Sequence, residues 1–220
     1  MYWFKIDKAS TTIPQSGTYH EWKPLLAKEA KNQCVYCAIH EGSFGGERNF
    51  HVEHFKPKSR FRSHINNYYN LFYACAICNT FKGDEWPGTP GHNLSQIGFI
   101  NPSVVDYSRI FQSNATSSRL VSRHKAARYM IEQLYLNRPQ LILERRMVNA
   151  ERTLIKEQAR VEKSVQDWRE AGAPSSASHL IQQAVSLLSD INRILVSIRR
   201  TAPYTPQDVR RPKKKTTKRS

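Results

Sequence analysis

The chain has 220 residues, enough for one hydrophobic core with a small satellite domain, and 39% of them are hydrophobic, which excludes a largely disordered protein. Lys and Arg number 34 against 18 Asp and Glu, so the net charge of +16 predicts a polyanionic partner, most often nucleic acid. No apolar run approaches the roughly 20 residues that cross a bilayer, and the first residues lack the apolar region of a signal peptide. We therefore expect a cytoplasmic protein with no membrane partner.

The chain divides into four sections. Residues 1–30 hold tryptophans and leucines around a Pro/Gly turn region, and they predict a packing segment made of a strand and a short helix. Residues 31–112 hold all the cysteines and a histidine cluster, with turns at Gly and Pro pairs. Residues 113–200 are predicted to be helical. Residues 201–220 form a basic tail that we expect to be disordered and to bind polyanions without specificity.

The helical section is predicted from apolar residues at steps of three and four. A first stripe, Ala127 to Leu134, is closed by Asn137, and Pro139 suits the first turn of the next helix. Two longer stripes follow, Leu143 to Trp168 and Leu180 to Ile198, with Gly, Pro and Ser between them. They predict an antiparallel helical hairpin whose stripes face each other or leave an apolar edge for another protein.

Four cysteines form two Cys-x-x-Cys pairs, Cys34/Cys37 and Cys75/Cys78. A two-residue gap lets both sulfurs of a pair reach one tetrahedral Zn²⁺, and two such pairs would pin the ends of a compact unit. A closed set of four thiolates leaves no open position, so this zinc is expected to be structural.

Residues suited to phosphodiester hydrolysis lie between and beside the cysteine pairs. The segment 51–54 alternates like a strand, 69–73 resembles its partner, and 78–82 opens a short helix, which together predict a small ββα unit. Carboxylate and amide oxygens gathered there would suit a hard cation such as Mg²⁺. Neutral His54 can accept a proton from an attacking water, because the ordinary pKa of histidine lies near the working pH.

These segments resemble the HNH endonuclease superfamily, the ββα-metal nucleases. The matching stretches are CVYC (34–37), HVEHFKPKS (51–59) and YYNLFYACAICNTFKGD (68–84). The resemblance implies an α+β protein: a zinc-stapled ββα-metal nuclease core, followed by an α-helical domain with the long hairpin.

The resemblance also implies roles for four residues. His54 would be the general base, Glu53 and Asn79 would ligate a catalytic Mg²⁺ or Mn²⁺, and Asn70 would fix the catalytic loop by hydrogen bonds. Many relatives have Asp where this chain has Glu53, which keeps the oxygen donor and shifts the metal geometry. Some relatives have histidine where Asn79 stands, so an amide here argues for Mg²⁺ or Mn²⁺ over a cation that prefers nitrogen.

Basic residues flank the predicted site. Lys56, Lys58, Arg60 and Lys82 are expected to contact substrate, with a solvated basic loop as the alternative for the first three and a backbone-holding role as the alternative for Lys82. His51 is either a third ligand or a packing residue.

A narrower likeness rests on EHFKPKS (53–59), FINPS (99–103) and LNRPQLILERR (136–146), which are similar to HNH proteins of bacterial anti-phage systems of the Septu and retron-associated types. It implies a metal-dependent endonuclease, with DNA favoured, that acts as a defence effector beside an ATPase. Three alternatives remain: a ribonuclease acting on tRNA or other RNA, a non-catalytic zinc module that binds nucleic acid, and a docking subunit that is silent until its partner binds. The same site cuts either backbone, so the sequence does not separate RNA from DNA.

Overall fold

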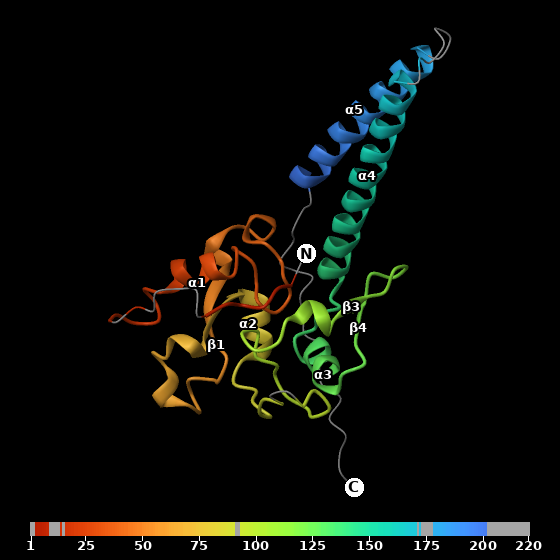
Figure 1. Cartoon of the computed structure of the whole chain (residues 1–220). Coiled ribbons are helices and arrows are strands. Elements are labelled where there is room, and N and C mark those ends of the chain that lie inside the picture. The colour runs from red at the N-terminus through yellow and green to blue at the C-terminus, as the bar shows by residue number, and fades with distance from the viewer. Residues whose placement is uncertain are drawn as a thin grey trace. The chain divides into compact units, whose positions relative to one another are not determined.

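The computed structural model describes residues 3–8, 14, 16–90, 93–170, 172 and 178–201 (Figure 1). These residues form five α-helices and two small antiparallel sheets of two strands each, which confirms the α+β class. They fall into two compact units, one that runs to Glu144 and one that begins at Arg145. In the described part of the chain, no helix is long and apolar enough to cross a membrane.

A β-hairpin followed by a helix lies at the centre of the first unit. Strand β1 (Phe50–His54) pairs with β2 (Leu71–Cys75), and helix α2 (Ala76–Lys82) follows directly. Every residue of β2 is buried, since α2 and the earlier helix α1 (Lys23–Glu29) both contact the two strands. Aromatic side chains fill this core, for example Phe50 and Tyr73, whose stacked rings are 4.7 Å apart. The predicted ββα unit is confirmed.

Strand β2 begins two residues later than the sequence predicts. Tyr68–Asn70 forms a 3₁₀ turn instead, in which the Asn67 side chain accepts a hydrogen bond from the N–H of Tyr69. This turn places Asn70 beside the loop that leaves β1, and its carbonyl accepts the N–H of Phe55 at 2.9 Å. At the other end of the unit, α2 stops because Gly83 takes a φ of 49°, a conformation that glycine adopts readily.

The described residues of the N-terminal section contain the predicted helix but not the predicted strand. Residues 3–8 make a single backbone hydrogen bond of the kind that joins neighbouring β-strands, from the N–H of Ile6 to the carbonyl of Pro102. Proline has no N–H with which to return a second bond, so no ladder forms. The segment is held instead by side chains, among them a buried ion pair of 2.7 Å between Lys8 and Glu29.

The first unit continues past the hairpin. Strands β3 (Gln112–Ser113) and β4 (Leu120–Val121) form the second sheet, and helix α3 (Lys125–Gln133) follows. The predicted apolar stripe of α3 is confirmed, because it buries Ala126, Ala127, Met130 and Ile131. All three elements belong to the compact unit that contains the ββα core. The domain boundary expected between residues 112 and 113 therefore does not coincide with the boundary between the compact units, and it stays a prediction.

The second unit holds most of one long helix and the whole of another. Helix α4 (Pro139–Glu170) starts at the proline predicted to open it, and α5 (Ser178–Thr201) runs back beside α4 (Figure 1). Val165 and Leu188 are buried there, which confirms the predicted helical hairpin. Other large apolar side chains of this unit are exposed, namely Ile155, Trp168, Leu180, Val185, Leu187, Ile194 and Val196. The predicted stripes are therefore not buried at Trp168, Leu180 and Leu187. Of the predicted disordered tail, residues 201–220, Thr201 is the last residue of α5, and residues 202–220 lie outside the described residues.

Candidate metal centre and active site

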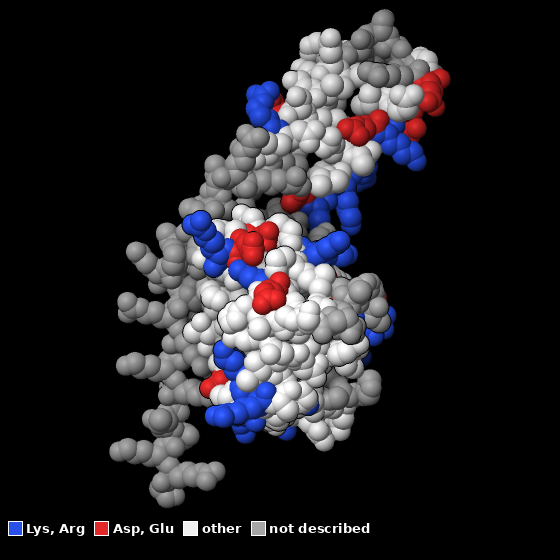
Figure 2. All heavy atoms as spheres, turned by 90° about the vertical axis from the view of Figure 1, so that its left-hand side faces the viewer, with Lys and Arg blue, Asp and Glu red and all other residues white. Residues whose placement is uncertain are grey.

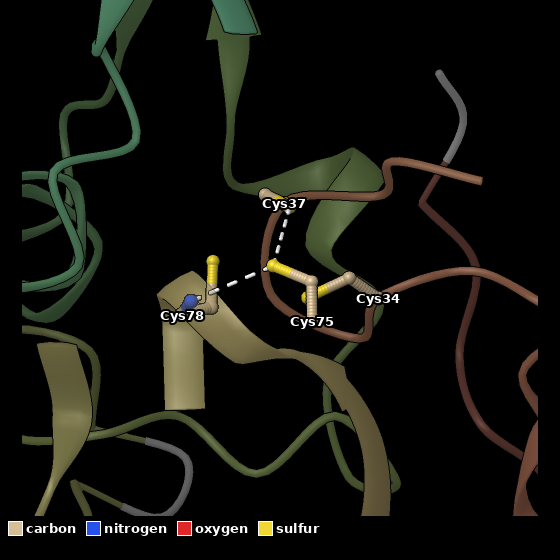
Figure 3. A group of neighbouring side chains, drawn as sticks. All are labelled: Cys34, Cys37, Cys75 and Cys78. Carbon is tan, nitrogen blue, oxygen red and sulfur yellow. Dashed lines mark hydrogen bonds between the residues drawn. The ribbon is translucent and has the colours of Figure 1, made fainter. Parts of the chain in front are cut away.

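The four cysteines meet at one buried point (Figure 3). Their Sγ atoms all lie within 4.8 Å of one another, and those of Cys37 and Cys75 are 3.8 Å apart. Four sulfurs bound about 2.3 Å from a tetrahedral Zn²⁺ would themselves be about 3.8 Å apart, so the cluster has the size that zinc requires. All four are free thiols, and no disulfide competes with a metal here.

Local hydrogen bonds shape each half of this cluster. In the first half, the N–H of Ala38 donates to the carbonyl of Cys34 at 2.8 Å, and Ala38 takes the left-handed φ of 57° that closes the turn. In the second half, Cys75 is the N-cap residue of α2, and its sulfur accepts the N–H of Cys78 at 3.5 Å. One pair therefore lies in a tight turn and the other at a strand–helix junction.

The four sulfurs form a group that could hold a metal ion. Burial raises the pKa of the Cys34 and Cys75 thiols. At Cys37 burial acts in the same direction, but hydrogen bonds from the other sulfurs and the charge of Arg138 outweigh it and lower the pKa. Four thiols in so small a volume do not ionise together without a metal, so metal binding at this site must release protons.

Glu53 lies at the centre of the candidate active site, on β1. It is 3% exposed, and its Oε1 atom accepts hydrogen bonds from the Tyr36 hydroxyl at 3.0 Å and from the Lys82 ammonium at 2.7 Å. Burial raises the pKa of the carboxyl, while Lys82 and Tyr36 oppose that shift. Within the described residues Oε2 has no such partner.

Lys82 is buried beside Glu53. Its side chain is 1% exposed, and its Nζ atom donates to the backbone carbonyl of His54 at 2.9 Å as well as to Glu53. This burial favours the alternative stated for Lys82, a backbone-holding role, and the substrate contact by Lys82 stays a prediction. Lys82 pairs with the carboxylate and holds the backbone of β1.

His54 follows Glu53 at the end of β1 and is largely buried. Its Nε2 atom lies 3.0 Å from the carbonyl oxygen of Ile65, and its ring meets that of Tyr19 edge-on with the centroids 4.7 Å apart. Burial is the main cause that lowers the pKa of His54, and the nearby charges of Lys58, Lys82 and His20 act in the same direction. The hydrogen bond with Ile65 opposes this shift, and the net effect favours the neutral imidazole.

Asn70 fixes the loop that follows His54. Its Oδ1 atom accepts the N–H of Lys56 at 2.8 Å, and its Nδ2 atom donates to the carbonyls of Lys56 at 3.1 Å and His64 at 3.3 Å. Three hydrogen bonds from one buried amide hold both ends of the segment between these residues. This is the geometry that a loop-fixing role requires.

Asn79 and His51 differ in their surroundings. Asn79 is half-buried on α2, one helical turn before Lys82, so the two side chains share the helix face that reaches Glu53. His51 is exposed on β1. Within the described residues the four cysteines form the one group of three or more His, Cys, Asp or Glu with metal-like spacing, and His51 does not join it.

The basic loop lies beside His54. Lys58 and Arg60 are exposed, and Lys58 donates to the Tyr19 hydroxyl at 3.2 Å while Arg60 donates to the carbonyl of Trp86 at 3.1 Å. Lys56 is half-buried, with its ammonium 5.7 Å from the centre of the Phe61 ring. The face of the molecule in Figure 2 shows Lys and Arg in several separate groups, some of which lie beside Asp and Glu.

Residues 34–85, which contain both cysteine pairs and the whole ββα unit, match the family model for HNH endonuclease. The resemblance stated from the sequence is therefore confirmed for this domain. Over 83 residues the chain is 34% identical to the Septu protein PtuB of Bacillus thuringiensis. These aligned residues make up 37% of this chain and 28% of that relative. The alignment thus spans less than a third of the relative's length. No solved structure gives a significant match.

Three residues at these sites were not singled out by the sequence. Tyr36 lies between the first two cysteines and reaches Glu53, Tyr19 comes from the N-terminal section to cover His54, and Arg138 reaches the sulfurs from the start of α4. Tyr36 alone carries a local signal, its position inside the cysteine turn. Tyr19 and Arg138 are brought in by tertiary packing, and no spacing or periodicity marks them.

Replacement of Cys37 by Ser should release the metal. A serine hydroxyl is a poor zinc ligand, and structural zinc contributes directly to the folding free energy of small domains. We expect zinc per chain, measured by elemental analysis, to fall from about one to near zero, together with a lower thermal midpoint. A purified parent chain without zinc, with a stability that chelators do not change, would contradict the zinc assignment.

Replacement of Tyr36 by Phe should destabilise the protein without loss of zinc. The change removes a buried hydrogen bond to a carboxylate, which costs about 1–3 kcal/mol of unfolding free energy. Denaturant unfolding measures this cost, and Tyr69→Phe, at an exposed tyrosine, is the matched control. Equal stability of the two variants would show that the Tyr36–Glu53 bond contributes nothing.

Proposed function

We propose that this chain is a metal-dependent HNH endonuclease that hydrolyses nucleic-acid phosphodiesters, with DNA as the favoured substrate. One observation carries the proposal: a neutral, carbonyl-anchored His54 stands beside a buried carboxylate in a domain that matches the HNH endonuclease model. A structural zinc module needs neither a neutral imidazole nor a buried carboxylate at this position.

The hydrogen bond to Ile65 selects the nitrogen of His54 that acts as base. A carbonyl oxygen only accepts hydrogen bonds, so the Nε2 atom 3.0 Å from it carries the proton of the neutral ring. Nδ1 then holds the free lone pair and takes a proton from the attacking water. The Tyr19 ring packed edge-on against the imidazole limits its rotation and keeps this nitrogen in place.

Glu53 and Asn79 are the residues that would hold a catalytic Mg²⁺ or Mn²⁺. Both offer oxygen donors, and Glu53 Oε2 is open while Oε1 is held by Tyr36 and Lys82. When bound, such a cation would neutralise charge on the phosphate and on the leaving 3′ oxygen. Asn70 keeps the loop after His54 in position, while Lys56, Lys58 and Arg60 attract the phosphates on either side of the scissile bond.

We also propose that the four cysteines hold a structural Zn²⁺ and that the protein is an effector of bacterial anti-phage defence. The similarity to a Septu protein supports the second statement. The exposed apolar side chains of α4 and α5 support a partner protein, an ATPase in this proposal, that docks on the hairpin.

Replacement of His54 by Ala tests the proposal. A general base contributes about 10²–10⁴-fold to rate, so cleavage should fall by that factor while zinc content, folding and nucleic-acid binding persist. Initial rates are measured on plasmid, single-stranded DNA and tRNA with Mg²⁺ or Mn²⁺. Glu53→Ala and Asn79→Ala should also lose activity, but a raised Mn²⁺ concentration should partly restore their cleavage. The same Mn²⁺ concentration should not restore cleavage by His54→Ala.

The matched control for His54→Ala is His51→Ala, which removes an exposed histidine from the same strand. Near-parental cleavage by His54→Ala would sink the assignment of the base. Cleavage of tRNA alone would make the protein a ribonuclease. If the parent cuts none of the three substrates, with or without the proposed partner, the zinc-binding module becomes the better description.

The pH dependence of cleavage should reflect the lowered pKa of His54. A lowered pKa keeps the base neutral to a lower pH, so activity is lost only as pH falls below the ordinary histidine value of about 6.5. A cation bound at Glu53 would act in the same direction. Lys58→Met removes one nearby positive charge and should move the acid limb of kcat/KM to higher pH, by less than about one unit. Arg62→Met, in the same loop, is the control, and an unmoved limb in Lys58→Met would contradict the electrostatic cause.

A further inference from the structure

Arg138 has the most buried cationic group near the cysteine cluster. Its side chain is 1% exposed, and both terminal nitrogens face sulfur. Nη1 lies 3.6 Å from the sulfur of Cys78, and Nη2 lies 3.7, 3.9 and 3.6 Å from those of Cys37, Cys75 and Cys78. One guanidinium thus donates to three of the four candidate zinc ligands.

The position of the guanidinium is fixed from its other side. Nη1 also donates to the carbonyls of Leu134 and Tyr135, which follow the end of α3. Within the described residues, none of the ion pairs involves Arg138, so its charge is not matched by a carboxylate. A buried charge without a partner is costly, and the sulfurs are the anionic groups within its reach.

The charge of the metal site explains what this arginine does. A Zn²⁺ with four thiolates carries a net charge of about −2, which is unfavourable in a buried, poorly solvated place. A rigid fork of N–H donors delivers a positive charge to several sulfurs at once, which the single ammonium of lysine cannot do. Groups that hydrogen-bond metal ligands in this way typically change metal affinity by about 10–100-fold.

We propose that Arg138 is the built-in counterion of the zinc site and that it fastens the first turn of α4 to that site; this rests on the structural zinc proposed above. The carbonyl of Arg138 accepts the N–H groups of Leu141 at 3.0 Å and Ile142 at 3.2 Å. Pro139 opens the helix and Leu141 is fully buried. The residue whose side chain compensates the thiolates is therefore the same one whose backbone caps α4.

The test compares Arg138→Gln and Arg138→Lys with Arg109→Gln, a substitution at an exposed arginine. Zinc affinity is measured by competition with a chromogenic chelator, and cysteine accessibility by the rate of alkylation. Arg138→Gln removes the charge and should weaken zinc binding by about 10–100-fold. Arg138→Lys should lose less zinc affinity than Arg138→Gln, and Arg109→Gln should bind zinc with the affinity of the parent. Hydrogen exchange at Leu141 and Ile142 should be faster in Arg138→Gln than in Arg109→Gln.

The outcomes distinguish failure of the proposed zinc site from failure of the proposed counterion. The measurements are zinc affinity and amide hydrogen exchange, and they do not depend on cleavage activity. A parent chain without zinc overturns the zinc site and its counterion together. A zinc-loaded parent whose affinity is unchanged in Arg138→Gln overturns the counterion alone. If Arg138→Gln does not fold, Arg138→Lys decides: one ammonium cannot reach three sulfurs, so weaker zinc binding supports the proposal and parental affinity overturns it.

Discussion

The convergence of four buried sulfurs on one point is the constraint on which the candidate active site depends. One side of the cluster is the turn that carries Tyr36, whose hydroxyl holds Glu53. The other side is the start of α2, the helix that carries Asn79 and Lys82. Because both groups that surround Glu53 are attached to cysteine-bearing segments, a metal that joins the sulfurs also sets the distance between them.

Buried charges in the first unit come in compensating sets. Glu53 is paired with Lys82, Lys8 with Glu29, and the sulfur cluster with Arg138. Of these positive groups Lys82 also acts on His54, where it and the exposed Lys58 add to burial, the main cause, in lowering the pKa of the imidazole. Burial and nearby positive charge therefore both favour the form of the candidate base that can accept a proton.

Local pattern determined much of what could be predicted. The two-residue gaps between cysteines, the strand alternation at 51–54, the stripe of α3 and the proline that opens α4 all specify structure over a few residues. The candidate ligands and base also follow from sequence order, because they lie within one continuous hairpin-and-helix unit. The errors occurred where one local feature competed with another, as at the 3₁₀ turn that delays β2 and the proline that prevents an N-terminal ladder.

The sequence by itself determined the class of domain, its candidate metal-binding cysteines and the identity of its candidate base. Tertiary structure alone decided that Lys82 is buried against Glu53, that Tyr19 covers His54, and that Arg138 reaches a sulfur 101 positions away in the chain. The physical reason is that burial and charge compensation depend on which side chains packing brings together. Residues so far apart leave no periodicity or spacing from which that contact could be predicted.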